Sequence, residues 1–153
     1  MPDLAYFLPI AFGIVHGILF SILLAGRGLW RRQPADLFLA ALLVAGSLRL
    51  LPYVLGFLDI NILWNEWMFL PLETGLLIGP LFWLFLRART NNAFRLQAKD
   101  LVHLIPYGVF AAYRLAVFSR DSAFVFDWVD RIDLPVIQPM VTLLIGVSLV
   151  VYL

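Results

Sequence analysis

The sequence of 153 residues contains no cysteine, and charged residues make up only 14% of it. The lack of cysteine excludes disulfide bonds and thiolate metal sites. The shortage of charge excludes an ordinary soluble domain, which carries about 25% charged and about 45–50% apolar residues. This chain is instead 63% hydrophobic. The composition predicts an all-α polytopic membrane protein whose helices are surrounded by lipid hydrocarbon.

Five long apolar stretches are expected to form membrane-spanning helices. Each can cross about 30 Å of hydrocarbon as a helix, and in lipid the backbone amides must bond within their own segment. The expected spans are residues 4–25, 37–58, 67–86, 101–118 and 135–153, in one domain. No basic residue precedes the first stretch, and it is too long for the core of a signal peptide, so we expect it to be retained.

Basic residues favour alternate connections between the spans, which predicts an orientation. The second connection offers only Asp59 and Glu66, and the fourth is rich in aspartate. Because cationic connections stay in the cytoplasm, we expect an N-terminus outside and a C-terminus on the cytoplasmic side. The basic residues are Arg27, Arg31 and Arg32 in the first connection, and Arg87, Arg89, Arg95 and Lys99 in the third.

The fourth connection and the C-terminus each carry a further expectation. Residues 119–133 form the longest connection, and Phe124, Phe126 and Trp128 predict that it lies along the lipid headgroups. The last span ends at Leu153 with no basic residue after it, unlike the first and third spans. We therefore expect the chain to be a fragment of a longer protein.

Three charged residues inside the spans are the strongest functional signal. A charge near the bilayer centre costs about 2.5–3.5 kcal/mol on insertion scales, so each requires a partner. Arg49, Glu73 and Arg114 fall in one layer in the outer half of the bundle, where Glu73 can pair with either arginine. Tyr107 shares a helix face with Arg114, together with His103 and Phe110. Three interpretations stay open: an ion pair that fixes helix register, a pocket for a small-molecule or lipid ligand, and a proton or ion relay.

Small residues and prolines predict where helices pack and flex. The first span carries Gly13, Gly17 and Ser21 four residues apart, and the third carries Gly75 and Gly79. Such stripes let helices approach closely, either within the bundle or in a homodimer. Glu73 is expected to point away from the Gly75/Gly79 stripe. The expected flexing points are Pro80 and Pro106, because proline removes a backbone hydrogen bond.

Nothing in the sequence supports catalysis or a cofactor. No glycine-rich phosphate loop, metal-ligand cluster or nucleophile–base pair is visible. His16, at mid-membrane, is expected to bond to a neighbouring helix rather than to a metal. Because the basic residues lie in short connections, we expect this chain itself to bind no nucleic acid.

Two motifs around the basic third connection are the most distinctive. One reads Gly79-Pro80-Leu81, and the other reads Asp100-Leu101-Val102-His103-Leu104-Ile105-Pro106. This arrangement resembles the membrane-embedded N-terminal half of bacterial AraC-type transcriptional regulators, as does His16-Gly17 in a Leu-rich first span. The resemblance covers nearly the whole chain, although Arg49 departs from the uniformly apolar second helix of that family.

The resemblance implies a sensor and anchor in the bacterial inner membrane. About seven helices precede two cytoplasmic helix-turn-helix units in that family, so the last two helices and the DNA-binding half would be missing here. A signal would shift helix packing around Arg49, Glu73 and Arg114. Two alternatives are the same sensor joined to a LytTR-type regulator or a histidine kinase, and a small transporter or transporter subunit.

Overall fold

The computed structural model describes residues 4–58, 60, 66–91 and 93–152, so Asp59 and Leu153 lie outside the described residues. Within these ranges the chain is helical and forms no strand, in agreement with the predicted all-α class. The elements, in chain order, are α1 (Leu4–Arg31), α2 (Pro34–Phe57), η2 (Glu66–Phe69), α3 (Gly75–Thr90), α4 (Ala98–Leu101), η3 (Val102–Leu104), α5 (Ile105–Phe118), α6 (Ser122–Trp128), η4 (Val129–Ile137) and α7 (Gln138–Tyr152).

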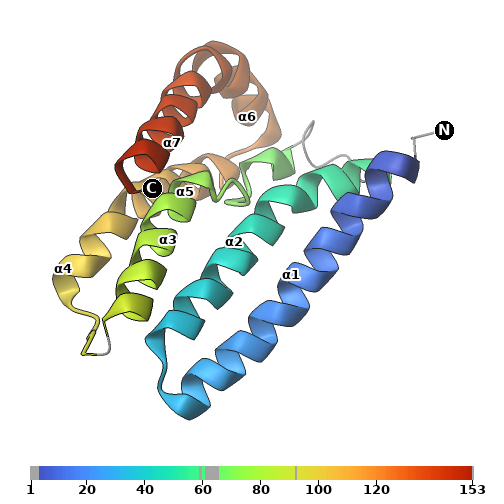
Figure 1. Ribbon diagram of the computed structural model, residues 1–153. Helices are drawn as coiled ribbons and strands as arrows, with labels where there is room; N and C mark the ends of the chain where they lie inside the picture. The colour runs from blue at the N-terminus through green and yellow to red at the C-terminus, as the bar shows by residue number, and fades with distance from the viewer. Residues whose placement is uncertain (1–3, 59, 61–65, 92, 153) are drawn as a thin grey trace.

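Helices α1 and α2 form an antiparallel hairpin that is joined by a very short turn (Figure 1). Helix α1 continues to Arg31, six residues beyond the expected span, because nothing in its last turns prevents helix formation. Arg32 then adopts a left-handed conformation with φ 51°, and Pro34 starts α2. Proline suits a first helical turn, because its missing N–H has no helical partner at that position.

The third expected span is not one continuous helix, which corrects that prediction. Residues 66–69 form the short 3₁₀ helix η2, a turn follows, and α3 begins only at Gly75. Pro71 lacks the N–H that a helix would need, and the Glu73 carboxylate accepts the Gly75 N–H at 3.1 Å. With 16 residues, α3 extends about 24 Å, which is less than the thickness of bilayer hydrocarbon, about 30 Å.

The second half of the chain is more helical than the sequence predicts. The expected interfacial loop 119–133 is instead helix α6 and the π-helix η4, which runs directly into α7. Asp121 caps α6 by accepting the Phe124 N–H at 2.9 Å. Val125 and Val129 are buried, Phe124 and Phe126 are exposed on the helix surface, and Trp128 packs against the buried residues and donates to the Tyr113 hydroxyl at 3.0 Å.

Two small hydrophobic clusters hold this half together. One joins η2, α5, α6 and η4 through Phe69, Val117, Val125 and Val129. The other joins α3, α5 and α7 through Leu76, Phe110 and Val141. In a helix that is apolar on every side, only a few of the apolar residues have to pack in a protein core, because lipid covers the others.

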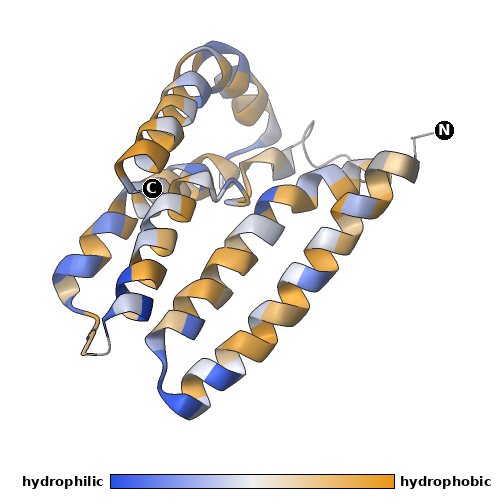
Figure 2. Cartoon of the chain, in the orientation of Figure 1, coloured by the Kyte–Doolittle hydropathy of each residue, from blue (hydrophilic) through white to orange (hydrophobic). Residues whose placement is uncertain are grey.

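Four helical segments are long and apolar enough to cross a membrane. They are Phe7–Arg31, Pro34–Phe57, Ala98–Phe118 and Ser122–Tyr152. Figure 2 shows that their sides are largely hydrophobic, whereas the turn after α1 and the last turn of α3 are hydrophilic. These lengths and compositions are those of a membrane protein.

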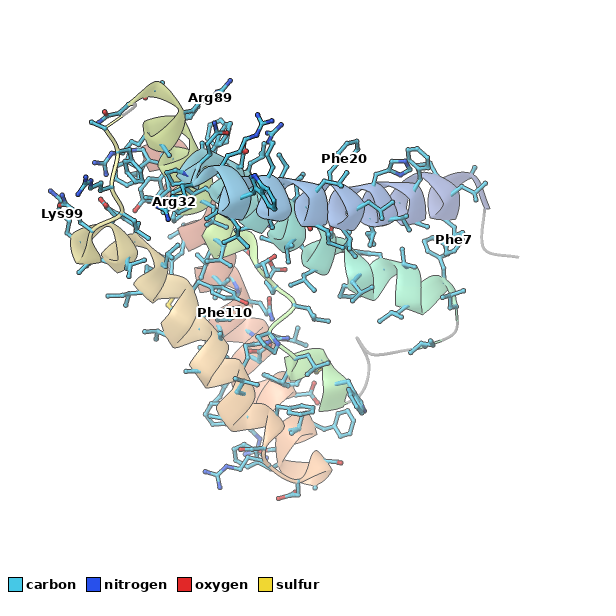
Figure 3. The ribbon with its side chains drawn as sticks, turned by 90° about the horizontal axis from the view of Figure 1, so that it is seen from below. Phe7, Phe20, Arg32, Arg89, Lys99 and Phe110 are labelled. Carbon is cyan, nitrogen blue, oxygen red and sulfur yellow. The ribbon has the colours of Figure 1, made fainter. Side chains whose placement is uncertain are left out.

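The helices form two arms that diverge from one end of the molecule. The first arm is α1 with α2, and the second arm contains α5, α6, η4 and α7. Helix α3 packs against α2 on one side and α7 on the other. Figure 3 shows Arg32, Arg89 and Lys99 at the end where the arms meet, and α5 running away from α1.

Candidate functional site

Residues 66–74, which we call the bridging segment, connect the two arms at their open side. Toward the second arm, the Tyr107 hydroxyl donates to the Pro71 carbonyl at 2.9 Å. The Arg114 guanidinium donates to the Met68 carbonyl. Toward the first arm, the buried Thr74 hydroxyl donates to the Ala45 carbonyl at 2.6 Å. The bridging segment therefore contacts both arms through hydrogen bonds to its own backbone and side chains.

The structure pairs Arg49 of α2 with Glu73 of the bridging segment. Arg49 Nε lies 3.5 Å from Glu73 Oε1. The side chains remain 39% and 32% exposed, so the pair is reachable from outside the protein. The sequence allowed Glu73 to pair with either Arg49 or Arg114, and in the structure its ion-pair partner is Arg49.

Arg114 occupies a different environment. Its side chain is buried, and its guanidinium carbon lies 4.8 Å from the Phe69 ring centre and 5.6 Å from that of Phe110. Within the described residues no carboxylate lies in ion-pair range of it, and its buried Nε has no hydrogen-bond partner. Aromatic faces attract a guanidinium, but they leave its N–H donors free for an acceptor.

These residues line a pocket between the arms. Its volume is about 170 Å³, and Arg49, Glu73, Arg114 and Gln138 supply its charged and amide groups. A second hollow of about 400 Å³ shares Met68, Arg114 and Gln138 with the first, and its other lining residues, from α6 and η4, are the apolar Phe126, Val129 and Leu134 and the carboxylates Asp130 and Asp133. A ligand with an acidic group and an apolar body matches this pair of spaces.

The helix face that the sequence singled out, which lies on η3 and α5, points into the protein. His103 Nδ1 lies 2.7 Å from the Tyr152 hydroxyl of α7, and Phe110 belongs to the cluster with Leu76. Tyr107 and Arg114 contact the bridging segment, as described above. Tyr107 itself does not line the pocket; it fixes the backbone at Pro71, two residues before Glu73.

Gln138 and Thr74 are site residues that the charge pattern alone did not identify. Gln138 Nε2 donates to Asp133 Oδ2 at 3.0 Å, and Asp133 also accepts from the Tyr113 hydroxyl at 2.7 Å. An amide in an apolar helix was a usable signal, because a polar group in lipid needs a partner. Thr74 gave no such signal, because its role depends on where α3 starts.

Glycines mark the closest helix contacts. A Cβ added to Gly79 would lie 2.7 Å from Ser148 Oγ of α7, and one added to Gly75 would lie 2.6 Å from Ile145 Cδ1 of the same helix. A Cβ on Gly17 would overlap Ser47 of α2. The Gly75/Gly79 stripe thus faces α7. Glu73 does not point opposite it as expected, because Glu73 precedes the helix and lies beside Gly75.

The stripe on α1 follows a different repeat from the predicted one. Ser21 is buried, but a Cβ added to Gly13 would meet no atom of another element within 4 Å. The buried residues are Ile14, Ser21 and Gly28, seven apart. Residues four apart on a helix are offset by about 40° around its axis, whereas residues seven apart are offset by only about 20°. Residues seven apart therefore stay on the side of α1 that faces α2.

Other predicted residues have local rather than long-range contacts. His16 Nδ1 lies 2.9 Å from the Phe12 carbonyl of its own helix, so the expected inter-helix bond is wrong. Pro80 is buried inside α3, whereas Pro106 lies in the first turn of α5, where it removes no helical hydrogen bond.

Among the described residues, no group of three histidine, aspartate or glutamate side chains could hold a metal ion.

Comparison with known proteins adds no relative to this description. No protein-family model matches the chain, and no curated protein or solved structure shows significant similarity to it. The geometry of the pocket, the bridging segment and the two arms therefore carries the functional argument by itself.

Proposed function

We propose that the chain is the membrane-embedded sensor and anchor module of a bacterial transcriptional regulator of the AraC type. One observation carries the proposal. The pocket formed by Arg49, Glu73 and Arg114 lies on the bridging segment that both arms contact. A ligand that favours one arrangement of this segment changes the relative packing of the arms. Packed helices respond by discrete shifts, and such shifts can be transmitted along a helix to an output domain.

The proposed signal is a small-molecule or lipid ligand with an acidic group. The Arg114 guanidinium can bind a carboxylate or phosphate through charge-assisted hydrogen bonds. The larger hollow beside it has an apolar part, formed by Phe126, Val129 and Leu134, that accommodates a hydrocarbon body. Such a ligand would compete with Glu73 for Arg49, because both anions would then lie in one pocket. Loss of the Arg49–Glu73 contact is the proposed switching event.

The orientation that goes with this function has an external N-terminus and the basic connections in the cytoplasm of a bacterial cell. Five crossings, with the short α3 as the third, place residue 152 inside. The native chain has no cysteine, so single-cysteine variants report one site each. A membrane-impermeant maleimide is expected to label the Arg120→Cys variant in intact cells. The Arg95→Cys variant is expected to react only after the membrane is opened, and its labelling in intact cells would contradict the proposed orientation.

The switching mechanism predicts that Glu73 controls the distance between the arms. Spin labels on the Val15→Cys and Leu143→Cys variant, both exposed positions, report on α1 and α7. Adding Glu73→Gln removes the charge that pairs with Arg49, so the measured distance distribution is expected to shift or broaden. Asp127→Asn removes the Asp127–Arg131 pair at the far side of the second arm and serves as the matched control. An unchanged distribution in Glu73→Gln contradicts the mechanism.

Two further measurements separate this function from its alternatives. The coding sequence that follows residue 153 supports the AraC-type output if it encodes paired helix-turn-helix units. A LytTR-type or kinase domain there supports the alternative outputs. The half-exposed ion pair in a pocket is also a feature of transporters, which would show solute flux in proteoliposomes that Glu73→Gln abolishes.

A further inference from the structure

The end of the molecule where the arms meet carries an excess of unpaired positive charge. Both buried carboxylates at this end already have arginine partners. Asp36 accepts from Arg27 Nε at 2.6 Å and from Arg27 Nη2 at 2.8 Å, and Asp100 accepts from Arg87 at 2.8 Å. At this end of the molecule, the described cations without a carboxylate in ion-pair range are Arg31, Arg32, Arg89, Arg95 and Lys99.

Two of these arginines, from different elements, line one hollow. Its volume is about 280 Å³, several times the volume that one water molecule occupies, about 30 Å³. Arg32 and Gln33 of the α1–α2 turn line it together with Arg89 and Asn91 at the end of α3. Figure 3 shows Arg32 and Arg89 at the same end of the molecule.

The floor of the hollow is held in place by aromatic packing. Phe94 is buried, and its ring centre lies 6.0 Å from that of Phe38 on α2. On its other side, the Arg87 guanidinium lies 5.4 Å from the Phe94 ring, and the same guanidinium binds Asp100. Phe94, one of the lining residues, therefore packs against side chains of α2 and α3 without a ligand.

The backbone at Arg32 places a guanidinium at the rim of the hollow at some cost. Its φ of 51° lies in the left-handed region, where glycine is free of strain and residues with a side chain are disfavoured. An arginine at this position therefore supplies a cation where the turn itself favours glycine.

The surroundings of the hollow are those of a membrane interface. Leu29 and Trp30, in the last turn of α1, are 70% and 90% exposed, and both precede Arg31 and Arg32 directly. Tryptophan followed by arginine is typical of the depth at which hydrocarbon meets headgroups. A ligand held between Arg32 and Arg89 at this depth would have its apolar part in the lipid.

We propose that this hollow binds the phosphate of an anionic lipid headgroup, with Arg32 and Arg89 as its two cationic contacts and Gln33 and Asn91 as further hydrogen-bond donors. The lipid remains in the bilayer, and its headgroup connects the α1–α2 turn to the end of α3. The site depends on membrane embedding but not on the regulator function, so the two proposals can fail separately. Its location at the junction of the arms gives the lipid a structural role in setting their starting arrangement.

The test uses the full chain in neutral detergent micelles, with native mass spectrometry to count bound lipid. Phosphatidylglycerol is expected to bind in preference to phosphatidylcholine. Each arginine near an anionic lipid contributes about fivefold in affinity, so Arg32→Gln with Arg89→Gln is expected to weaken phosphatidylglycerol binding roughly 30-fold. Neither residue has an ion-pair partner among the described residues, so the variant is expected to keep its helical circular dichroism.

The matched control is Arg31→Gln with Arg95→Gln, which removes the same charge from the same end without altering the lining of the hollow. Phosphatidylglycerol binding is expected to fall clearly less in this control than in the Arg32→Gln and Arg89→Gln variant, because Arg31 and Arg95 do not line the hollow. Equal losses in the two double variants would overturn the proposal in favour of diffuse charge attraction. Equal binding of the two lipids would overturn it as well. Soluble glycerol phosphate that binds as tightly as phosphatidylglycerol would show a free-anion site and no lipid site.

Discussion

Replacing Gly79 with leucine is expected to separate α3 from α7 and to lower the free energy of unfolding by about 1–3 kcal/mol. Even a Cβ at this position would lie 2.7 Å from Ser148 Oγ, 3.1 Å from the Ser148 carbonyl oxygen and 3.1 Å from Tyr152 Cδ2. The carbonyl belongs to the backbone of α7, so the helix itself must move. Tyr152 would then lose its contact with His103, which the structure places at 2.7 Å. Unfolding in mixed micelles, followed by tryptophan fluorescence, measures the loss.

The matched control for this substitution is Gly108→Leu on α5. A Cβ added to Gly108 meets no atom within 4 Å, so the leucine extends into the surroundings. Its expected effect on the free energy of unfolding stays within about 0.5 kcal/mol, as for ordinary surface substitutions. Equal losses of unfolding free energy at the two positions would show that leucine disturbs these helices irrespective of contacts. The close approach of α3 to α7 would then make no measurable contribution to stability.

Replacing Glu73 with alanine is expected to destabilise the protein by about 1–3 kcal/mol, because Arg49 then keeps its charge at membrane depth without a partner. Glu73 also accepts the Gly75 N–H at 3.1 Å, so α3 loses an interaction at its start. Adding Arg49→Ala removes the unpaired cation. The double variant is therefore expected to be more stable than the sum of the two single losses predicts, by about 0.5–3 kcal/mol.

The control for this cycle pairs Glu73→Ala with Arg114→Ala. Arg114 makes no ion pair with Glu73 and contacts the Met68 carbonyl and two aromatic rings instead. We expect a smaller coupling energy for this pair than for Glu73 with Arg49. A larger one would mean that Arg114 is the true counter-ion of Glu73 and that the 3.5 Å contact of Arg49 is energetically minor.

The sequence predicted the first two spans well. Residues 4–25 and 37–58 lie within α1 and α2, apart from Leu58 at the end of α2, and each helix continues through an internal proline, Pro9 or Pro52. Backbone groups in lipid have no alternative to helical hydrogen bonding, so the helices persist on both sides of these prolines. The third span failed at Pro71 and Glu73. Hydropathy averages over such residues, whereas a missing N–H and a carboxylate that bonds to the backbone act at single positions.

The candidate site was only partly predictable for a related reason. Depth along a helix follows from residue number, so Arg49, Glu73 and Arg114 could be assigned to one layer. Which arginine faces Glu73 depends on the rotation and tilt of three elements. The bridging segment decides it, and that segment was expected to be helix. Gln138 lines the pocket at the point where η4 runs into α7, and the sequence did not predict that the segment before the last span is helical.

The sequence by itself determined that the chain is helical and apolar and that its cations gather in alternate connections, because these properties depend on residue type and on the needs of a backbone in lipid. Only the tertiary structure decided that the arms diverge from the basic end, that Glu73 pairs with Arg49, and that Gly79 contacts α7. Such features depend on how side chains from distant segments fit together. An apolar sequence constrains that fit weakly, because lipid accepts almost any apolar face that protein leaves uncovered.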